Sequence, residues 1–156
     1  QDLTDPKENP HYINLLAYAQ KNQIDVTFIS AQVEMEIAHL NQEEQSTFLE
    51  AYGLKQSGLN EVIRKSYDLL GLKTFFTAGE KEVRAWTFKK GMKAPECAGI
   101  IHSDFERGFI KAETLAYDDL VTYKTPLQAK EHGRVRMEGK EYQVKDGDIM
   151  LFRFNV

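Results

Sequence analysis

A pair of short apolar runs around a glycine-containing connector constrains the fold of this chain most strongly. Phe75–Thr77 and Val83–Phe88 are rich in β-branched and aromatic residues, and residues 78–81 (Ala-Gly-Glu-Lys) separate them. Two such runs with a short connector predict a β-hairpin. The segment 95–102 begins with a proline, which favours a helix start because the first helical turn does not use its missing N–H. A further strand is predicted over 109–117.

The remaining C-terminal residues continue the alternation of helices and strands. Short helical turns are expected over 118–123 and 127–132. The runs Arg134–Met137 and Tyr142–Val144 flank a glycine-containing connector and predict a second hairpin. Ile149–Phe154 alternates strictly and predicts a strand. The face of that strand expected to pack against the helix 95–102 comprises Met150, Phe152 and Phe154.

The first 70 residues differ from the rest in their predicted secondary structure, with several helical patterns and one short strand pattern. The expected order is a helix over 10–21, a strand over 24–29 and helices over 32–40, 41–52 and 57–70. Asparagine and serine residues at the predicted helix starts are favourable N-caps. No Pro/Ser-rich linker follows, and Gly71 ends the last helix. We therefore place a domain boundary near Gly71–Leu72.

The predicted fold class is α+β. A hairpin followed by a short helix and further strands is the opening of a β-grasp, or ubiquitin-like, fold, which we expect over residues 72–156. Residues 1–71 form a separate part with a strand and helices.

Length and charge set further bounds. At 156 residues the chain suits one domain plus an appendage. Residues 1–70 hold 5 Lys/Arg and 11 Asp/Glu, a net charge of −6, and residues 71–156 hold 15 and 13, a net charge of +2. The second part lacks the strongly basic balance that marks a nucleic-acid binder by charge alone.

Other features of the composition bear on location. No apolar run approaches the ~18 residues of a membrane span, and the first residues carry no signal-peptide pattern. The single cysteine, Cys97, is typical of a reducing compartment. We expect a cytoplasmic protein with no membrane partner. The missing initiator methionine is compatible with a truncated chain.

Two stretches resemble a known family. AGEKEVRAWTFKKGMKAPECAGIIHSDFERGFIKAE and the ending MEGKEYQVKDGDIMLFRFNV are similar to the C-terminal TGS domain of the YchF/Obg-like ATPases. The resemblance implies that residues 72–156 are a TGS domain and that residues 1–71 are the end of a P-loop NTPase (G) domain. It also implies a fragment of a translation-factor-class protein that binds ATP or GTP with Mg²⁺ and associates with ribosomes.

The resemblance also gives a role to Ser30, Ala31 and Gln32. In the family this position contacts the purine base, whereas the pattern alone favours an N-cap at Ser30. No G-x-x-x-x-G-K-[ST] motif occurs, no Asp-x-x-Gly switch motif precedes a predicted helix, and the family's base-selecting Asn-x-x-Glu motif would end just before Gln1. We expect no nucleotide cofactor and no hydrolysis for this chain alone.

A set of cations around one tryptophan is the predicted RNA or ribosome contact. Aromatic side chains flanked by cations stack on and neutralise single-stranded RNA. A tryptophan in a strand is also a common core residue, and Arg107 can simply pair with Asp104 and Glu106 in its turn. The predicted contact residues are Arg84, Trp86, Lys89, Lys90, Lys93, Arg107 and Lys111, with Phe105 as a weaker candidate.

Independent catalysis or metal binding has little support. The histidines are scattered, and Cys97 and His102 lie five residues apart, so they do not share a helix face. We expect His102 to cap the end of its helix. Cys97 is interpreted as a small packed residue; a redox sensor would need a lowered thiol pKa.

A second functional hypothesis stays open. The ubiquitin-like domain is then a protein-interaction or intramolecular regulatory module that covers the nucleotide site of its own G domain. RNA binding that falls steeply with salt distinguishes the first hypothesis from the second.

Overall fold

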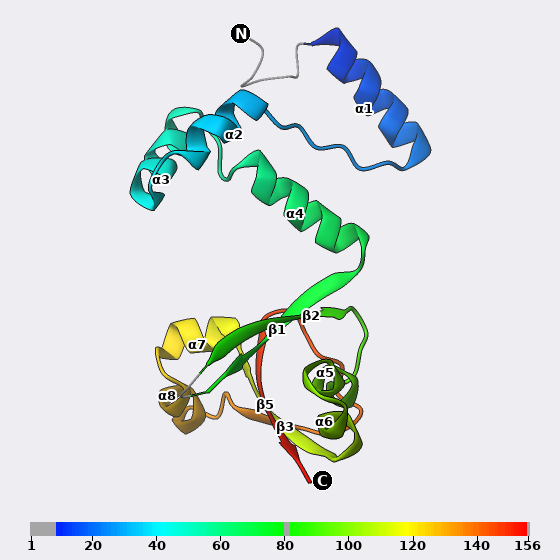
Figure 1. The fold of residues 1–156 in the computed structure, drawn as a ribbon, viewed down its shortest axis with the longest axis vertical. Coiled ribbons are helices and arrows are strands. Elements are labelled where there is room, and N and C mark those ends of the chain that lie inside the picture. Colours follow the sequence, from blue (N-terminus) through cyan, green and yellow to red (C-terminus); the bar gives the residue numbers. More distant parts are fainter. Residues whose placement is uncertain (1–8, 80–81, 156) are drawn as a thin grey trace. The chain divides into compact units, whose positions relative to one another are not determined.

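The computed structural model describes residues 9–79 and 82–155. The chain divides into two compact units, Gln1–Ser66 and Tyr67–Val156. The predicted boundary near Gly71–Leu72 lies a few residues beyond this division. Glu80 and Lys81 of the predicted hairpin connector lie outside the described residues, as do residues 1–8 and 156. Figure 1 labels the elements in chain order.

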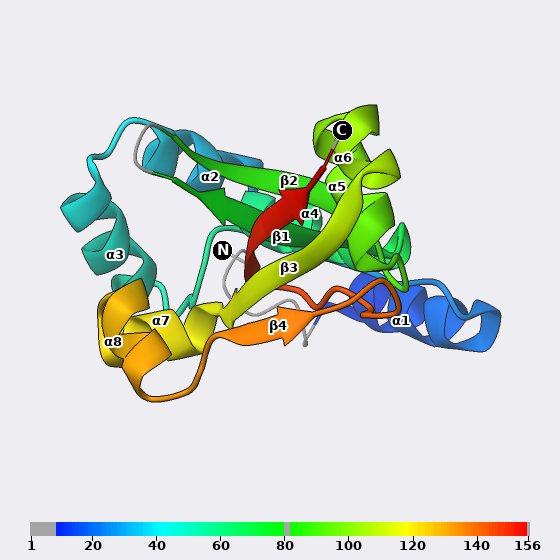
Figure 2. The same ribbon diagram turned by 90° about the horizontal axis from the view of Figure 1, so that it is seen from below.

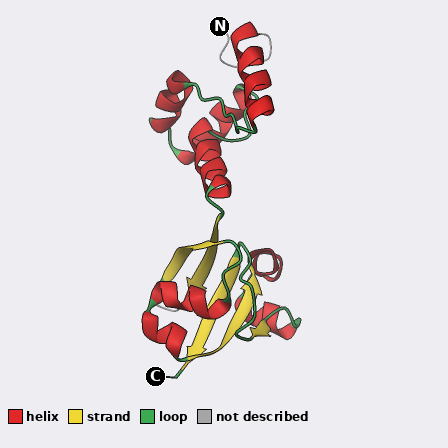
Figure 3. Ribbon diagram, turned by 90° about the vertical axis from the view of Figure 1, so that its right-hand side faces the viewer, coloured by secondary structure: helices red, strands yellow, loops and turns green. Residues whose placement is uncertain are grey.

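The first unit consists of helices and loops in the part that the structure describes (Figure 3). Capping residues begin them as predicted: the Asn9 side chain accepts from the His11 N–H, and Asn41 forms a capping box with Glu44. Local hydrogen bonds thus define the helix starts. The helices are α1 (Pro10–Asn22), α2 (Ala31–Ala38), α3 (Gln42–Ala51) and α4 (Gly58–Leu69), and α4 spans the division between the units.

The strand predicted over 24–29 is wrong. These residues form a loop between α1 and α2, and no strand pairs with them within residues 9–79 and 82–155. A strand exists only through hydrogen bonds to a neighbouring strand, so β-branched composition alone does not make one. One loop carbonyl, that of Val26, accepts a 2.6 Å hydrogen bond from Lys65 Nζ instead.

The second unit contains a five-stranded mixed sheet in the order β2-β1-β5-β3-β4 (Figure 2). The predicted first hairpin is confirmed, because β1 and β2 pair antiparallel over their whole length from Leu72↔Lys89 to Ala78↔Val83. The central pair β1–β5 is parallel, and β3 pairs antiparallel with both β5 and β4. The strands are β1 (Leu72–Ala78), β2 (Val83–Lys89), β3 (Phe109–Ala116), β4 (Arg136–Glu138) and β5 (Asp148–Phe154).

Helices α5 (Ala94–Ile101) and α6 (Ser103–Arg107) lie on one face of this sheet (Figure 2). The core forms between α5 and the strands. The predicted inward face of β5 is confirmed for Met150 and Phe152, which are buried with α5 residues. Phe154 instead stacks on Phe105 of α6, with ring centroids 3.9 Å apart. Two further helices, α7 (Tyr117–Tyr123) and α8 (Pro126–Glu131), follow β3 close to the predicted positions.

The predicted second hairpin is wrong. Only residues 136–138 form a strand there, and this strand pairs with β3 rather than with residues 142–144. The latter segment lies beside the start of α5, where Gln143 bridges to Lys93 and the Tyr142 carbonyl accepts from the Ala94 N–H. Val144 is buried in the core, and its N–H donates to the Met92 carbonyl at 3.1 Å, so these contacts hold the segment beside the start of α5.

Candidate functional site

Strand β2 places Arg84 and Trp86 together, as predicted. Both side chains lie on the helix-covered face, and the Arg84 guanidinium carbon lies 4.1 Å from the indole centroid. The indole Nε1–H donates to Thr77 Oγ1 at 2.9 Å, and the ring stacks on Phe75 of the core. Trp86 is therefore half-buried: one part packs on the core, as the alternative interpretation held, and the other part stays accessible.

The basic loop is separated from this pair. Side chains alternate along a strand, so Lys89 points to the face opposite Trp86 and lies ~17 Å along the strand from Arg84. Lys89 and Lys90 are exposed. The Lys93 ammonium forms a 2.6 Å ion pair with Glu141, and this hydrogen bond raises the pKa of Lys93. Of the three loop lysines, Lys89 and Lys90 thus offer the more available charge.

The two remaining predicted cations, Arg107 and Lys111, lie on other elements than the Arg84–Trp86 pair and the basic loop. Arg107 ends α6 and pairs with Asp104, as the structural interpretation of that turn predicted. Lys111 lies on β3 opposite Arg153, whose guanidinium bonds Glu113 through two nitrogens. The seven predicted contact residues therefore occupy several separate places on the second unit rather than one patch.

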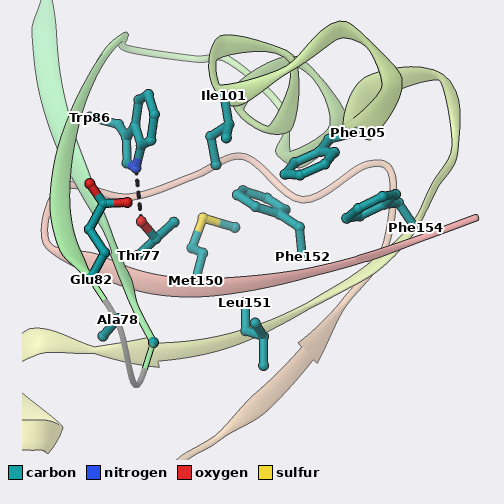
Figure 4. A pocket seen from close by; sticks show the side chains of 11 residues that line it. Thr77, Ala78, Glu82, Trp86, Ile101, Phe105, Met150, Leu151, Phe152 and Phe154 are labelled. Carbon is teal, nitrogen blue, oxygen red and sulfur yellow. Dashed lines mark hydrogen bonds between the residues drawn. The ribbon is translucent and has the colours of Figure 1, made fainter.

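An apolar groove of about 600 Å³ lies between the β1–β2 hairpin and the α5–α6 helices (Figure 4). The side chains of Trp86, Ile101 and Phe105 form its walls, and β5 forms its floor. The alternation of residues 149–154 predicts that Met150, Phe152 and Phe154 face the core, but it does not show where the helices leave that face uncovered. The groove lining also includes Thr77, Ala78, Gly79, Glu82, Met150, Leu151, Phe152 and Phe154.

The predicted base-contact residues sit at the start of α2 in the first unit. Ser30 is the N-cap, and its Oγ accepts from the Val33 N–H at 3.3 Å, which confirms the capping interpretation. Gln32 donates to Glu36 one turn further on. A cavity of about 290 Å³ adjoins Ser30. Its other lining residues are Tyr12, Val26, Thr27, Phe28, Val33, Glu34, Tyr52, Leu54, Gln56, Gly58, Glu61 and Lys65.

That cavity has a charged wall. Lys65 pairs with Glu61 at 3.2 Å while it also donates to the Val26 carbonyl, and the hydrogen bond from Lys65 lowers the pKa of Glu61. Among the side chains that the structure describes, Thr27 Oγ1 is buried without a hydrogen-bond partner. The cavity thus combines a lysine, a carboxylate and a hydroxyl beside the predicted base-contact residues.

The cysteine and histidine side chains do not form a reactive centre. Cys97 is fully buried, which confirms the packing interpretation. Burial raises its pKa to about 12, the opposite of the lowered pKa that a redox sensor needs. His102 differs from the prediction in part: it ends α5, but its Nδ1 accepts from the Asp104 N–H and so caps the start of α6. No group of three potential metal ligands occurs among the described residues.

None of the helices in residues 9–79 and 82–155 is both long and apolar enough to cross a membrane.

A comparison with known protein families identifies the class of the second unit. The family model YchF-GTPase_C, described as a protein of unknown function (DUF933), matches residues 72–155. The second unit is thus a C-terminal domain of the YchF GTPase type. The chain belongs to the YchF family, which confirms the resemblance found in the sequence.

The similarity to whole relatives covers the first unit as well as the second. The chain is 58% identical over 155 residues to the ribosome-binding ATPase YchF of Bacillus subtilis, covering 99% of the chain and 42% of that protein. It is 51% identical to the protein of the same name from Escherichia coli O157:H7, covering 96% of the chain and 41% of the relative. The chain therefore spans about two fifths of the length of these curated relatives.

Solved structures agree with the α+β fold. The Schizosaccharomyces pombe YchF GTPase superposes with a TM-score of 0.83 at 33% identity, covering 97% of this chain and 40% of that one. A GTP-binding protein from Pyrococcus horikoshii gives a TM-score of 0.66 at 19% identity over 97% of this chain and 44% of that one, which is a likeness of fold.

Proposed function

We propose that this chain is the C-terminal part of a ribosome-binding ATPase and that its second unit is a TGS domain that contacts the ribosome or its RNA. The observation that carries the proposal is that relatives 40–58% identical over nearly the whole chain are named ribosome-binding ATPases. The sheet order, with α5 crossing the face of a β1–β2 hairpin, is compatible with the β-grasp fold of such a domain.

Lys89 and Lys90 are the best placed contact residues. Both are exposed at the end of β2 and have no ion pair among the described residues. Lys93 and Arg107 already pair with carboxylates, which weakens their attraction for phosphate. A surface with two or three available cations binds RNA weakly and loses affinity as salt rises.

Co-sedimentation with ribosomes tests this proposal. The chain should pellet with ribosomes at low salt and be released at high salt. The variant Lys89→Glu/Lys90→Glu should lose most of this binding, and the matched variant Lys130→Glu/Lys140→Glu, with the same change of charge on exposed positions, should retain it. Equal loss in both variants would show non-specific attraction, and no loss in either would remove Lys89 and Lys90 from the contact.

The first unit is proposed to complete a nucleotide-binding domain whose other parts precede it in the intact protein. Its apolar side chains support this, because Ile13, Leu59 and Ile63 are each about half exposed. ATP or GTP with Mg²⁺ would then bind in the intact cytoplasmic protein, with Ser30, Ala31 and Gln32 beside the base. The cavity next to Ser30 is compatible with that role.

A second candidate is a protein-interaction or regulatory domain, and the apolar groove favours it. Its walls and floor are aromatic and aliphatic, which suits protein side chains better than phosphates. In this role the second unit covers the nucleotide site of its own G domain. A faster ATPase rate after removal of residues 72–156 from the intact protein would support this candidate, and an unchanged rate would contradict it.

A further inference from the structure

Strand β2 is an edge of the sheet. It pairs with β1 on one side, and in the part of the chain that the structure describes no strand pairs with its other side. The pairing runs over seven residues without a register shift, and the strand contains no proline. Bulges and prolines are common protections of an edge strand, and β2 has neither. An unbroken edge of this length is a template for another strand.

The antiparallel register shows which backbone groups face outward. The Lys90 N–H donates to the Gly71 carbonyl, and the Gly79 N–H donates to the Glu82 carbonyl. Hydrogen-bonded pairs alternate along such a ladder, so the even-numbered residues of β2 bond to β1. The N–H and C=O groups that point away from β1 belong to Val83, Ala85 and Thr87.

The surroundings of this edge are accessible. Val83 is 73% exposed, and Ala85 and Thr87 are exposed as well. On the other face of the strand, Arg84 covers Trp86, which also forms a wall of the apolar groove. A strand added here therefore meets the outward N–H and C=O groups of β2. Val83, Ala85 and Thr87 lie on one face, where the Tyr67 hydroxyl is 3.3 Å from Thr87 Oγ1, and Trp86 lies on the other.

The charge of the edge selects the partner. Three cations, Arg84, Lys89 and Lys90, lie on β2 or directly after it, against the single carboxylate of Glu82. Opposite charges on neighbouring strands stabilise a pair, and like charges destabilise it. An added strand with Asp or Glu residues is therefore favoured over a neutral or basic one.

We propose that the edge of β2 binds an extended acidic polypeptide segment as a sixth strand of the sheet. Backbone bonds to Val83, Ala85 and Thr87 supply affinity, and alternate apolar side chains beside Trp86 supply specificity. The inference goes beyond the ribosome contact and holds whether or not Lys89 and Lys90 also touch RNA. Single-stranded RNA is the competing ligand, but it uses the cations and not a run of outward amides.

A selection from a random 12-residue peptide library on the 156-residue chain tests the proposal. Enriched sequences should alternate apolar residues with Asp or Glu. A synthetic peptide of the most enriched sequence should slow amide hydrogen exchange at Val83, Ala85 and Thr87. A selection without enrichment, or protection confined to other residues, would overturn the proposal.

Ala85→Pro removes one outward N–H without breaking a bond to β1, so the sheet should persist while the added strand is lost. We expect the peptide to bind this variant about tenfold or more weakly, and the matched variant Ala85→Val to bind it as the native chain does. Unchanged binding to Ala85→Pro would overturn the proposal.

Lys89→Glu/Lys90→Glu gives a second arm if Ala85→Pro fails to fold. The selected peptide should bind it several-fold more weakly, while Lys130→Glu/Lys140→Glu keeps native binding. A 15-nucleotide oligouridylate added to the native chain should leave amide exchange at Val83, Ala85 and Thr87 unchanged, because RNA uses the cations and not the outward amides. Protection of these amides by the RNA, or a peptide affinity insensitive to the lysine changes, would overturn the proposal.

Discussion

The Tyr142 hydroxyl donates a 2.7 Å hydrogen bond to Oδ2 of Asp148, whose side chain is 2% exposed. The same carboxylate accepts from the Lys145 N–H at 2.9 Å and from Arg136 Nη2 at 3.3 Å. These bonds join β4, the segment after it and the start of β5. A buried carboxylate is tolerated only when hydrogen-bond donors surround it. This network therefore stabilises the packing of β4 and residues 142–145 against the start of β5.

Tyr142→Phe should destabilise the second unit by about 1–3 kcal/mol, because it takes one donor from a buried charge. Urea unfolding followed by circular dichroism measures the change. Tyr117→Phe is the control, since Tyr117 is exposed and its hydroxyl makes no hydrogen bond among the described residues. Equal stability of Tyr142→Phe and the native chain would show that the hydroxyl is dispensable.

Cys97 should resist alkylation in the folded chain. Burial raises its pKa to about 12, so at pH 8 about 10⁻⁴ of the thiol is ionised, and the thiolate is the reactive form. Iodoacetamide labelling followed by mass spectrometry should show modification only after urea is added. Rapid labelling of the folded chain would contradict the burial of this side chain.

The same shift gives a pH dependence. A thiol in the unfolded chain ionises near the ordinary value of 9.0, whereas the folded one ionises at about 12. The unfolded state therefore loses its proton first, and the free energy of unfolding falls as the pH rises above about 9. Cys97→Ala should lessen this fall, which urea titrations at pH 8 and pH 10 would measure.

Gly108→Ala should destabilise the second unit by about 1–3 kcal/mol. A Cβ at this position would collide with the Asn155 backbone, whose N–H donates to the Gly108 carbonyl at 2.9 Å. Gly139→Ala is a matched control, because a Cβ there has no neighbour within 4 Å. Thermal unfolding of the two variants compares them, and similar melting temperatures would refute the close approach of residues 108 and 155.

Mg-ATP should show no measurable binding to this chain in isothermal titration. Binding of β- and γ-phosphates needs a glycine-rich cradle of backbone N–H groups with a lysine, and the sequence contains no such motif. The intact Bacillus subtilis relative serves as the positive control. Micromolar binding to the 156-residue chain would show that the first unit holds the nucleotide by itself.

Tertiary contacts overrode local patterns where a segment needed a distant partner. Residues 24–29 have strand composition but no neighbouring strand, and residues 142–144 pack beside α5 instead of closing a hairpin with β4. Arg84 and Lys89 lie five residues apart in the sequence, yet the two-residue period of the strand directs them to opposite faces. The strand geometry therefore separates Arg84 from Lys89, and the predicted cationic residues do not form one patch.

Features that form within a few residues could be predicted from the amino-acid sequence alone. The cap of Asn41 with Glu44, the hairpin of β1 with β2 and the alternation of β5 all follow from neighbouring side chains and backbone, and the long similar stretches showed the family. The groove, the surroundings of Asp148 and the position of β2 at the edge of the described sheet depend on the three-dimensional fold. Each of these joins or separates segments far apart in the chain, because packing and strand order depend on the whole fold at once.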